Sequence, residues 1–182
     1  MKEKKFLIWD TETTGLPLHP DAPLDLQPHV IEFGGKYLSC KTGKVIGEID
    51  FLIDPGIIIT DEITKITGIT NDAVKGKPRF IKLMPQIAKA FHESAGCLAH
   101  NSPFDEFMLT CEFRRCGMMT FEWPPVRLCS ISLYRNDFGY DPKLTQLYER
   151  VLGRKLDQKH RAGSDVDALV EIVQKEEIWR MI

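Results

Sequence analysis

Asp10 and Glu12 are the first residues whose types and spacing suggest chemistry. They follow the apolar run Phe6 to Trp9 and precede a turn that contains Gly15. A short run of aromatic and branched residues is typical of a buried strand, in which side chains two positions apart point the same way. Two adjacent carboxylates repel each other unless a cation lies between them, and Mg²⁺ prefers carboxylate oxygens. The spacing therefore predicts a metal site, and the alternative is an exposed acidic turn.

Asp105 is a third candidate for the same site. It lies one turn into an expected helix that follows a short apolar strand over residues 97–100. If that strand neighbours the first one, Asp105 lies at the sheet edge where α/β proteins usually bind ligands. The alternative is a capping box, with Ser102 at N-cap, Pro103 at N1 and Asp105 at N3.

Asp165 is the fourth candidate, because it shares a helical face with apolar residues. Asp165, Leu169 and Ile172 are spaced four and three residues apart, so they lie along one stripe of the last helix. An unpaired charge on a buried stripe is costly, so this carboxylate needs a partner. The alternative is a capping box from Ser164 to Asp167, in which Asp165 is an acidic residue at N1.

His160 lies five residues before Asp165, on the expected loop or first turn ahead of the last helix. An imidazole has an ordinary pKa near ~6.5 and is the side chain best suited to accept a proton at neutral pH. His160 is therefore a candidate for accepting a proton, and the alternative, which is commoner for a lone histidine, is a surface or structural role.

The elements that must position these residues follow an α/β pattern. The Pro-rich segment 17–28 is expected to be an irregular loop that borders a cleft. Strands are expected at 6–9, 29–39, 45–53, 97–100 and 126–131, and helices at 60–68, 79–93, about 102–116, 133–136, 144–152 and from about 165 to 179. This order predicts a mixed sheet with helices on both faces, in a single domain over residues 1–182.

The composition limits the classes of partner. The net charge of −2 argues against holding nucleic acid by bulk electrostatics alone. A polyanionic substrate would need bound metal or local basic clusters, which are otherwise ordinary exposed surface: Lys75, Lys77 and Arg79, and Arg154, Lys155, Lys159 and Arg161.

The cysteines and the lengths of the apolar runs indicate in which compartment the protein is expected. The five cysteines include no C-x-x-C pair, so neither a disulfide framework nor a zinc knuckle is indicated. No apolar run approaches the ~20 residues of a membrane helix, and the N-terminus does not match a signal peptide. We therefore expect a soluble, cytoplasmic protein that does not associate with membranes.

Three segments of the chain, taken in order, resemble the motifs of the DEDD exonuclease superfamily, in its His-containing branch. That branch includes the proofreading epsilon subunit of bacterial replicative DNA polymerase. The matching segments are DTETTGL at 10–16, AHNSPFD at 99–105 and HRAGSDVDA at 160–168, and secondary signatures match at Ile31-Glu32 and at 66–70. The chain departs from the family pattern at Thr67, where many relatives have histidine.

The resemblance implies a fold and a set of roles. The fold would be RNase H-like, with a mixed five-stranded sheet flanked by helices. His160 would be the general base, and two Mg²⁺ or Mn²⁺ ions would be held by Asp10, Glu12, Asp105 and Asp165. Substrate-binding residues would be Thr13, Thr14, Gly15, Leu16, Asn101 and Phe104. Leu16 would wedge between bases and Phe104 would stack on one, and core packing is the alternative for both.

The resulting expectation is a 3′-to-5′ exonuclease that acts on single-stranded or frayed DNA ends and releases nucleoside 5′-monophosphates. The alternatives are an RNA-trimming enzyme, an inactive nucleic-acid-binding module and a structural zinc protein that uses Cys111 and Cys116. The sequence shows no long tail that would tether it to a polymerase, so we expect a free-standing enzyme or a subunit of a small assembly. A homodimer and association with a polymerase both stay open.

Overall fold

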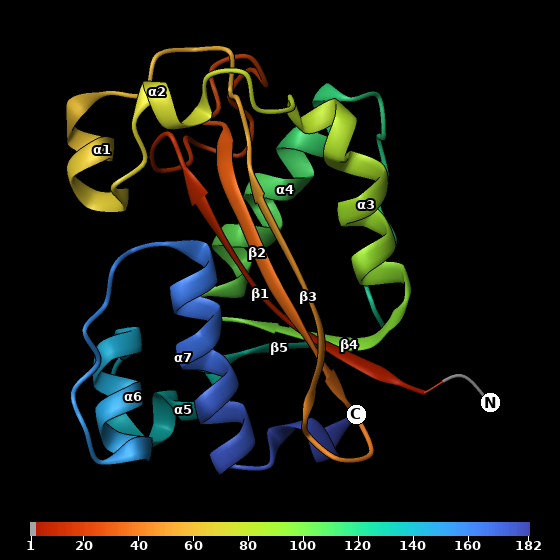
Figure 1. Ribbon diagram of the computed structural model, residues 1–182, viewed down its shortest axis with the longest axis vertical. Helices are drawn as coiled ribbons and strands as arrows, with labels where there is room; N and C mark the ends of the chain where they lie inside the picture. The colour runs from red at the N-terminus through yellow and green to blue at the C-terminus, as the bar shows by residue number, and fades with distance from the viewer. Residues whose placement is uncertain (1–2) are drawn as a thin grey trace.

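A five-stranded mixed sheet forms the centre of the protein, whose computed structural model describes residues 3–182 (Figure 1). The strand order is β3-β2-β1-β4-β5, so β1 is the central strand. The strands are β1 (Lys5–Thr13), β2 (Val30–Ser39), β3 (Val45–Leu52), β4 (Ser94–Ala99) and β5 (Val126–Cys129).

The strand directions follow from the connections. A tight turn joins β2 to β3, with Gly43 at φ 68° in the left-handed region, and the two strands pair antiparallel. β1 also pairs antiparallel with β2. β4 pairs parallel with β1 and with β5, because helical segments cross over between these strands.

Helices cover both faces of the sheet, as expected for strands that are buried on both sides. In Figure 1, α3 and α4 lie on one side of the sheet, α5, α6 and α7 lie on the other, and α1 and α2 lie near the C-terminal end of β1. The helices are α1 (Asp61–Thr67), α2 (Asn71–Val74), α3 (Phe80–His92), α4 (Ser102–Arg115), α5 (Ser130–Phe138), α6 (Leu144–Leu152) and α7 (Ala162–Lys175), followed by a short 3₁₀ helix, η1 (Ile178–Met181). None of the helices in this part of the chain combines the length and apolar character that a membrane crossing requires.

The alternation of β1 side chains divides the core into two layers. Leu7 and Trp9 pack into the cluster that contains α3 and α4 side chains, whereas Phe6 and Ile8 pack into the cluster that contains α6 and α7 side chains. All four are fully buried. The same alternation continues to the end of β1, so it determines which layer each of the following polar residues faces.

The expected α/β fold is confirmed, but several element boundaries differ from those expected. β1 continues to Thr13 rather than ending at Trp9, β4 begins at Ser94, and α5 spans Ser130–Phe138 rather than 133–136. β5 ends at Cys129 rather than residue 131, because its partner β4 ends at Ala99, which pairs with Cys129. The last helix ends at Lys175 rather than near residue 179, because Glu177 has a φ of 51°, which an α-helix does not accommodate.

Candidate active site

The site begins where β1 extends past its neighbour. Pairing between β1 and β4 stops at Ile8, opposite Leu98, whereas pairing between β1 and β2 continues to Thr13. The last residues of β1 are therefore open on the β4 side. Asp10 and Glu12 lie in this stretch, on the face of the sheet that α7 covers.

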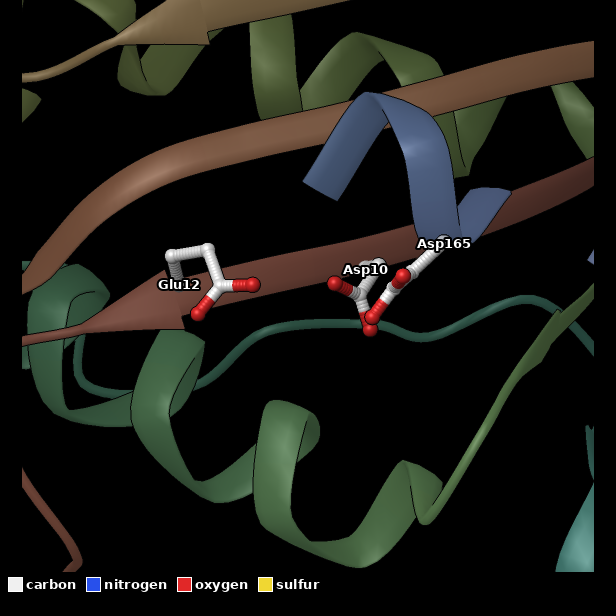
Figure 2. A group of neighbouring side chains, drawn as sticks. All are labelled: Asp10, Glu12 and Asp165. Atoms are coloured by element: carbon white, nitrogen blue, oxygen red, sulfur yellow. The ribbon is translucent and has the colours of Figure 1, made fainter. Parts of the chain in front are cut away.

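The N-terminal end of α7 brings Asp165 to the same place. Gly34 of β2 lies directly opposite Asp10 in the strand register. A Cβ at Gly34 would lie 2.9 Å from both the carbonyl carbon of Ala162 and the backbone nitrogen of Gly163, so glycine is what lets α7 approach the sheet so closely. As a result, carboxylate oxygens of Asp10, Glu12 and Asp165 lie within 4.8 Å of one another (Figure 2).

Asp105 reaches the open end of β1 from the opposite layer. Its Oδ1 accepts hydrogen bonds from the Thr11 hydroxyl at 2.6 Å and from the Thr11 backbone N–H at 3.2 Å. It thereby takes the position that a β4 residue would occupy if that strand continued. The capping-box alternative is wrong, because Asn101, at φ 61°, is the N-cap of α4 and makes no side-chain capping bond.

Asp105 lies at the edge of the acidic group rather than within it. Its negative charge contributes to the raised pKa of Asp10. However, the three carboxylates whose oxygens come within 4.8 Å of one another are those of Asp10, Glu12 and Asp165. The structure therefore brings all four predicted acids to one region and groups three of them tightly.

An ion pair between half-exposed Arg161 and the buried carboxylate of Glu32 fixes the start of α7. The carboxylate of Glu32, which is 1% exposed, accepts bonds at 3.0 Å from Nε of Arg161 and at 2.8 Å from the backbone N–H of Ala162. Arg161 is the N-cap of α7, so the capping box proposed from Ser164 onward is also wrong. In the sequence, Glu32 stands out only as part of a secondary signature, and its contact with the start of α7 was not predicted.

The electrostatics of the site make simultaneous ionisation of all four carboxyl groups unfavourable. Burial, together with the negative charges of Asp105, Glu12 and Asp165, raises the pKa of Asp10 well above its ordinary value. Burial and the charge of Asp165 raise the pKa of Glu12 to about 8. Burial raises the pKa of Asp105 to about 7, although the bonds from Thr11 act in the opposite direction. Such mutual repulsion is what a bound cation would relieve.

The donor set fits a hard divalent cation. Oδ2 of Asp165 accepts a hydrogen bond from Gln158 at 2.7 Å, whereas its Oδ1 is buried and has no hydrogen-bond partner. A buried carboxylate oxygen without a partner is costly, and an ion bound by the neighbouring carboxylates would satisfy it. Within residues 3–182, no cysteine belongs to a group of side chains close enough together to hold an ion, so the zinc alternative gains no support.

His160 is exposed and lies just ahead of α7. Its φ of 47° places it in the left-handed region, a conformation that is uncommon for residues other than glycine and that occurs often at functional sites. The positive charge of its imidazolium acts to lower the pKa of Asp165, against the effect of burial.

A hollow of about 630 Å³ adjoins Glu12. Most of the residues predicted to bind substrate line it, namely Thr13, Thr14, Gly15, Leu16 and Phe104. Leu16 is 80% exposed, so the core-packing alternative is wrong for this residue. Phe104 is half-buried and packs against the α3 and α4 core as well as lining the hollow, so it combines the two interpretations.

Other parts of the hollow differ from the sequence-based prediction. Asn101 is not among the residues that line it, and its side chain is exposed. Helix α1 supplies one wall through Ile63, Ile66 and Thr67, which were not predicted to bind substrate. The signal available in the sequence was the secondary signature at residues 66–70, which contains Ile66 and Thr67.

Two of the basic residues near the site are already paired within the protein. Arg161 binds Glu32, and Arg154 binds Glu171 on α7. Their charges are therefore partly neutralised, and the idea of a strongly basic cluster ahead of α7 is weakened.

Known proteins that resemble this chain show the family to which it belongs. The model of the RNase_T family, which is described as an exonuclease, matches residues 7–173. The chain is 31% identical over 175 residues to the PolC-type DNA polymerase III of Caldanaerobacter subterraneus subsp. tengcongensis, with 95% of this chain and 12% of that protein covered. It is 26% identical to the PolC-type DNA polymerase III of Halalkalibacterium halodurans, with 99% and 11% covered. The chain thus spans about an eighth of the length of these relatives.

Solved structures share the fold. The nuclease domain of 3′hExo, described as a DEDDh family member bound to rAMP, has a TM-score of 0.75 at 19% identity, with 97% of this chain and 93% of that chain covered. Exonuclease I has a TM-score of 0.76 at 20% identity, with 97% and 41% covered. The fold is therefore RNase H-like and is shared with these exonucleases. The chain belongs to the RNase_T exonuclease family.

Proposed function

We propose that this chain is a metal-dependent 3′-to-5′ exonuclease that acts on single-stranded or frayed DNA 3′ ends and releases nucleoside 5′-monophosphates. The observation that supports this most directly is the group of carboxylates from Asp10, Glu12 and Asp165, whose oxygens lie within 4.8 Å of one another beside an open hollow. Members of this exonuclease family use divalent metals, and this donor set suits such ions.

The proposed ligands are Asp10, Glu12, Asp105 and Asp165, which would hold two Mg²⁺ or Mn²⁺ ions. Such ions, when bound, activate a water molecule and stabilise the charge that develops on the phosphate and on the leaving 3′-oxygen. Asp105 would enter the set through its Oδ2, because its Oδ1 already accepts two bonds from Thr11.

The proposed role of His160 is to accept the proton of the attacking water at an imidazole nitrogen. The support for this role is the exposure of His160, its place in the chain just ahead of α7 and the influence of its charge on Asp165. If the imidazole of His160 were buried among the carboxylates, it would have no access to solvent.

The hollow beside Glu12 is the proposed site of the terminal nucleotide. Thr13 and Thr14 would bind its 3′-OH, Gly15 lets the backbone come close, Leu16 would pack between bases and Phe104 would stack on one. Asn101, the N-cap of α4, is a weaker candidate for binding the nucleotide, because its side chain does not line the hollow. Stacking tolerates every base, so little sequence preference is expected.

DNA is proposed as the substrate because the relatives named above are DNA polymerases. RNA is a second candidate, supported by similarity in fold to a 3′-exonuclease whose structure is described with a histone mRNA stem-loop (TM-score 0.72). Because the chain matches a short part of long polymerases, we also propose that it associates with a polymerase.

The decisive experiment uses purified protein with matched 5′-labelled DNA and RNA oligonucleotides, single-stranded and duplex, in Mg²⁺, Mn²⁺ or chelator. Stepwise shortening from the 3′ end of single-stranded DNA, with release of nucleoside 5′-monophosphates, is expected only in the presence of metal. Oligonucleotides that stay intact in both metals would refute the proposal, and faster shortening of RNA would select the second candidate.

A further inference from the structure

The long segment between β1 and β2 is held by a buried polar cluster on α4. Glu112 of α4 is 3% exposed, and its Oε1 lies 3.0 Å from Nδ1 of His29. The same oxygen accepts bonds from the backbone N–H of Val30 at 3.1 Å and from Nη1 of Arg115 at 2.8 Å. One carboxylate oxygen thus joins the helix to the start of β2.

Arg115 extends this cluster along the segment. Its guanidinium donates to the backbone carbonyl of Pro28 at 3.0 Å and to that of Leu24 at 2.7 Å, and it also donates to the carbonyl of Gln27. A planar guanidinium can reach several acceptors at once, which a lysine ammonium cannot do in the same geometry. Its charge is balanced by Glu112, and the side chain is only 14% exposed.

The cluster is connected to the proposed substrate site through His29. The backbone carbonyl of His29 accepts from the N–H of Thr14 at 2.8 Å, and the N–H of His29 donates to the Thr14 hydroxyl at 2.9 Å. Thr14, Gly15 and Leu16 line the hollow beside Glu12. The residue that α4 holds through its side chain is therefore the one that holds Thr14 through its backbone.

Helix α4 contacts both the acidic group and the segment that carries the proposed substrate-binding residues. Asp105 and Glu112 are seven residues apart and both buried, so they lie on the same face of the helix. The first bonds to β1 at the acidic group, and the second bonds to the segment that leads away from it. The position of the substrate-binding wall relative to the acids is thus set by one rigid element.

We propose that Glu112 and Arg115 are positioning residues, which fix segment 14–29 so that Thr14, Gly15 and Leu16 are already in place when the terminal nucleotide arrives. This inference rests on the proposed function, because it assumes that the hollow holds that nucleotide. Without the cluster, ordering of the segment would have to accompany substrate binding, and that cost would weaken affinity rather than slow the chemical step.

The test compares Arg115→Gln with Arg114→Gln, which removes an exposed cation from the adjacent position on α4. At a temperature well below unfolding, Arg115→Gln should raise KM for a single-stranded oligonucleotide about 10-fold, the change that ~1.4 kcal/mol of ordering cost would produce, and leave kcat nearly unchanged. Hydrogen exchange should quicken over residues 14–29, while Mn²⁺ affinity measured by calorimetry should match the wild type. Arg114→Gln should change none of these quantities.

Glu112→Gln and Arg115→Lys provide independent variants. Each should shift KM and hydrogen exchange in the same direction, and Arg115→Lys should recover only part of the loss, since one ammonium cannot bind all the carbonyls. If Arg115→Gln fails to fold, Glu112→Gln decides the question. Unchanged KM together with unchanged exchange over residues 14–29 would overturn the proposal, as would a loss confined to stability.

The proposed function and this inference fail in different ways. A wild-type protein that leaves every oligonucleotide intact refutes the nuclease assignment. A wild type that is active, with variants that lower kcat or Mn²⁺ affinity and leave KM unchanged, refutes only the positioning role of Glu112 and Arg115.

Discussion

The hydroxyl of Thr11 donates a hydrogen bond of 2.6 Å to Oδ1 of Asp105, and thereby ties the central strand to α4. The same oxygen also accepts the Thr11 backbone N–H. These bonds act to lower the pKa of a carboxyl that burial raises to about 7. The contact therefore determines both where Asp105 points and how readily it ionises.

Thr11→Val should weaken metal binding without removing a proposed ligand. Loss of the hydroxyl leaves the Asp105 carboxylate with one fewer donor, which raises its pKa further and frees it to rotate. We expect Mn²⁺ affinity near neutral pH to fall about 10-fold, as is typical when a contact that orients a ligand is lost. Calorimetry would measure the affinity. Thr110→Val, whose hydroxyl bonds only the Glu106 carbonyl, is the matched control, and equal affinities in both variants would contradict the prediction.

Asp165→Asn should abolish turnover and stabilise the metal-free protein. The substitution removes one of the carboxylates that raise the pKa values of Asp10 and Glu12, so the repulsion within the folded site decreases. Turnover should fall at least about 100-fold, whereas Tm in chelator should rise by roughly 2–4 °C for each ~1 kcal/mol of relief. Asp167→Asn, on the exposed side of α7, should keep activity. Normal turnover by Asp165→Asn would remove this residue from the metal site.

His160→Ala should slow the reaction and leave binding intact. Loss of a general base typically costs about 10²- to 10⁴-fold in rate. Oligonucleotide affinity, measured by fluorescence anisotropy in Ca²⁺ to prevent turnover, should match the wild type. The control is His92→Ala, which removes an exposed imidazole at the end of α3. A variant that binds poorly and yet cleaves bound substrate at the normal rate would show that His160 is a binding residue.

The metal-free protein should lose stability as the pH rises. The pKa of Glu12 is raised from 4.5 to about 8 in the folded state, so the folded protein binds more protons than the unfolded chain between these values. The associated stability is fully present below about pH 4.5 and is lost as the pH approaches about 8. Thermal unfolding in chelator should therefore show a Tm that falls across this range. Mg²⁺ binds the ionised carboxylates, so its stabilising effect should increase with pH.

Glu12→Gln provides the control for this pH dependence. It removes the titrating group, so the slope of Tm against pH in chelator should decrease. A wild-type Tm that does not change between about pH 5 and about pH 8 would mean that the acids of the site do not carry the raised pKa values described above.

Leu16→Ala should weaken substrate binding at no cost in stability. The side chain is 80% exposed, so truncation leaves no cavity in the core. KM for single-stranded oligonucleotides should rise by about 10-fold, in line with the ~1–3 kcal/mol that stacking contacts to a base contribute. Leu26→Ala removes another exposed leucine, at 62%, that does not line the hollow. Equal KM values for both variants would exclude Leu16 from the substrate site.

The amino-acid sequence by itself determined the properties that are local to each element. The run from Phe6 to Trp9 is apolar at every position, and this predicted a central strand covered on both sides. Strand geometry then placed Asp10 and Glu12 on one face, and helical spacing placed Asp165 on a buried face of α7. Within an element, backbone geometry alone sets the direction of each side chain, so these predictions needed no knowledge of the neighbours.

Only the tertiary structure decided between interpretations that share one local pattern. Ser102 to Asp105 fits a capping box as well as a candidate metal ligand. The capping box was excluded because Asn101 is the N-cap of α4, and Asp105 instead accepts a bond from Thr11, a residue far away in the sequence. The approach of α7 depended on Gly34, whose missing side chain lets that helix lie against β2. Distances between elements arise from packing and from where neighbouring strands end, and neither is encoded in the local propensities that a sequence pattern reports.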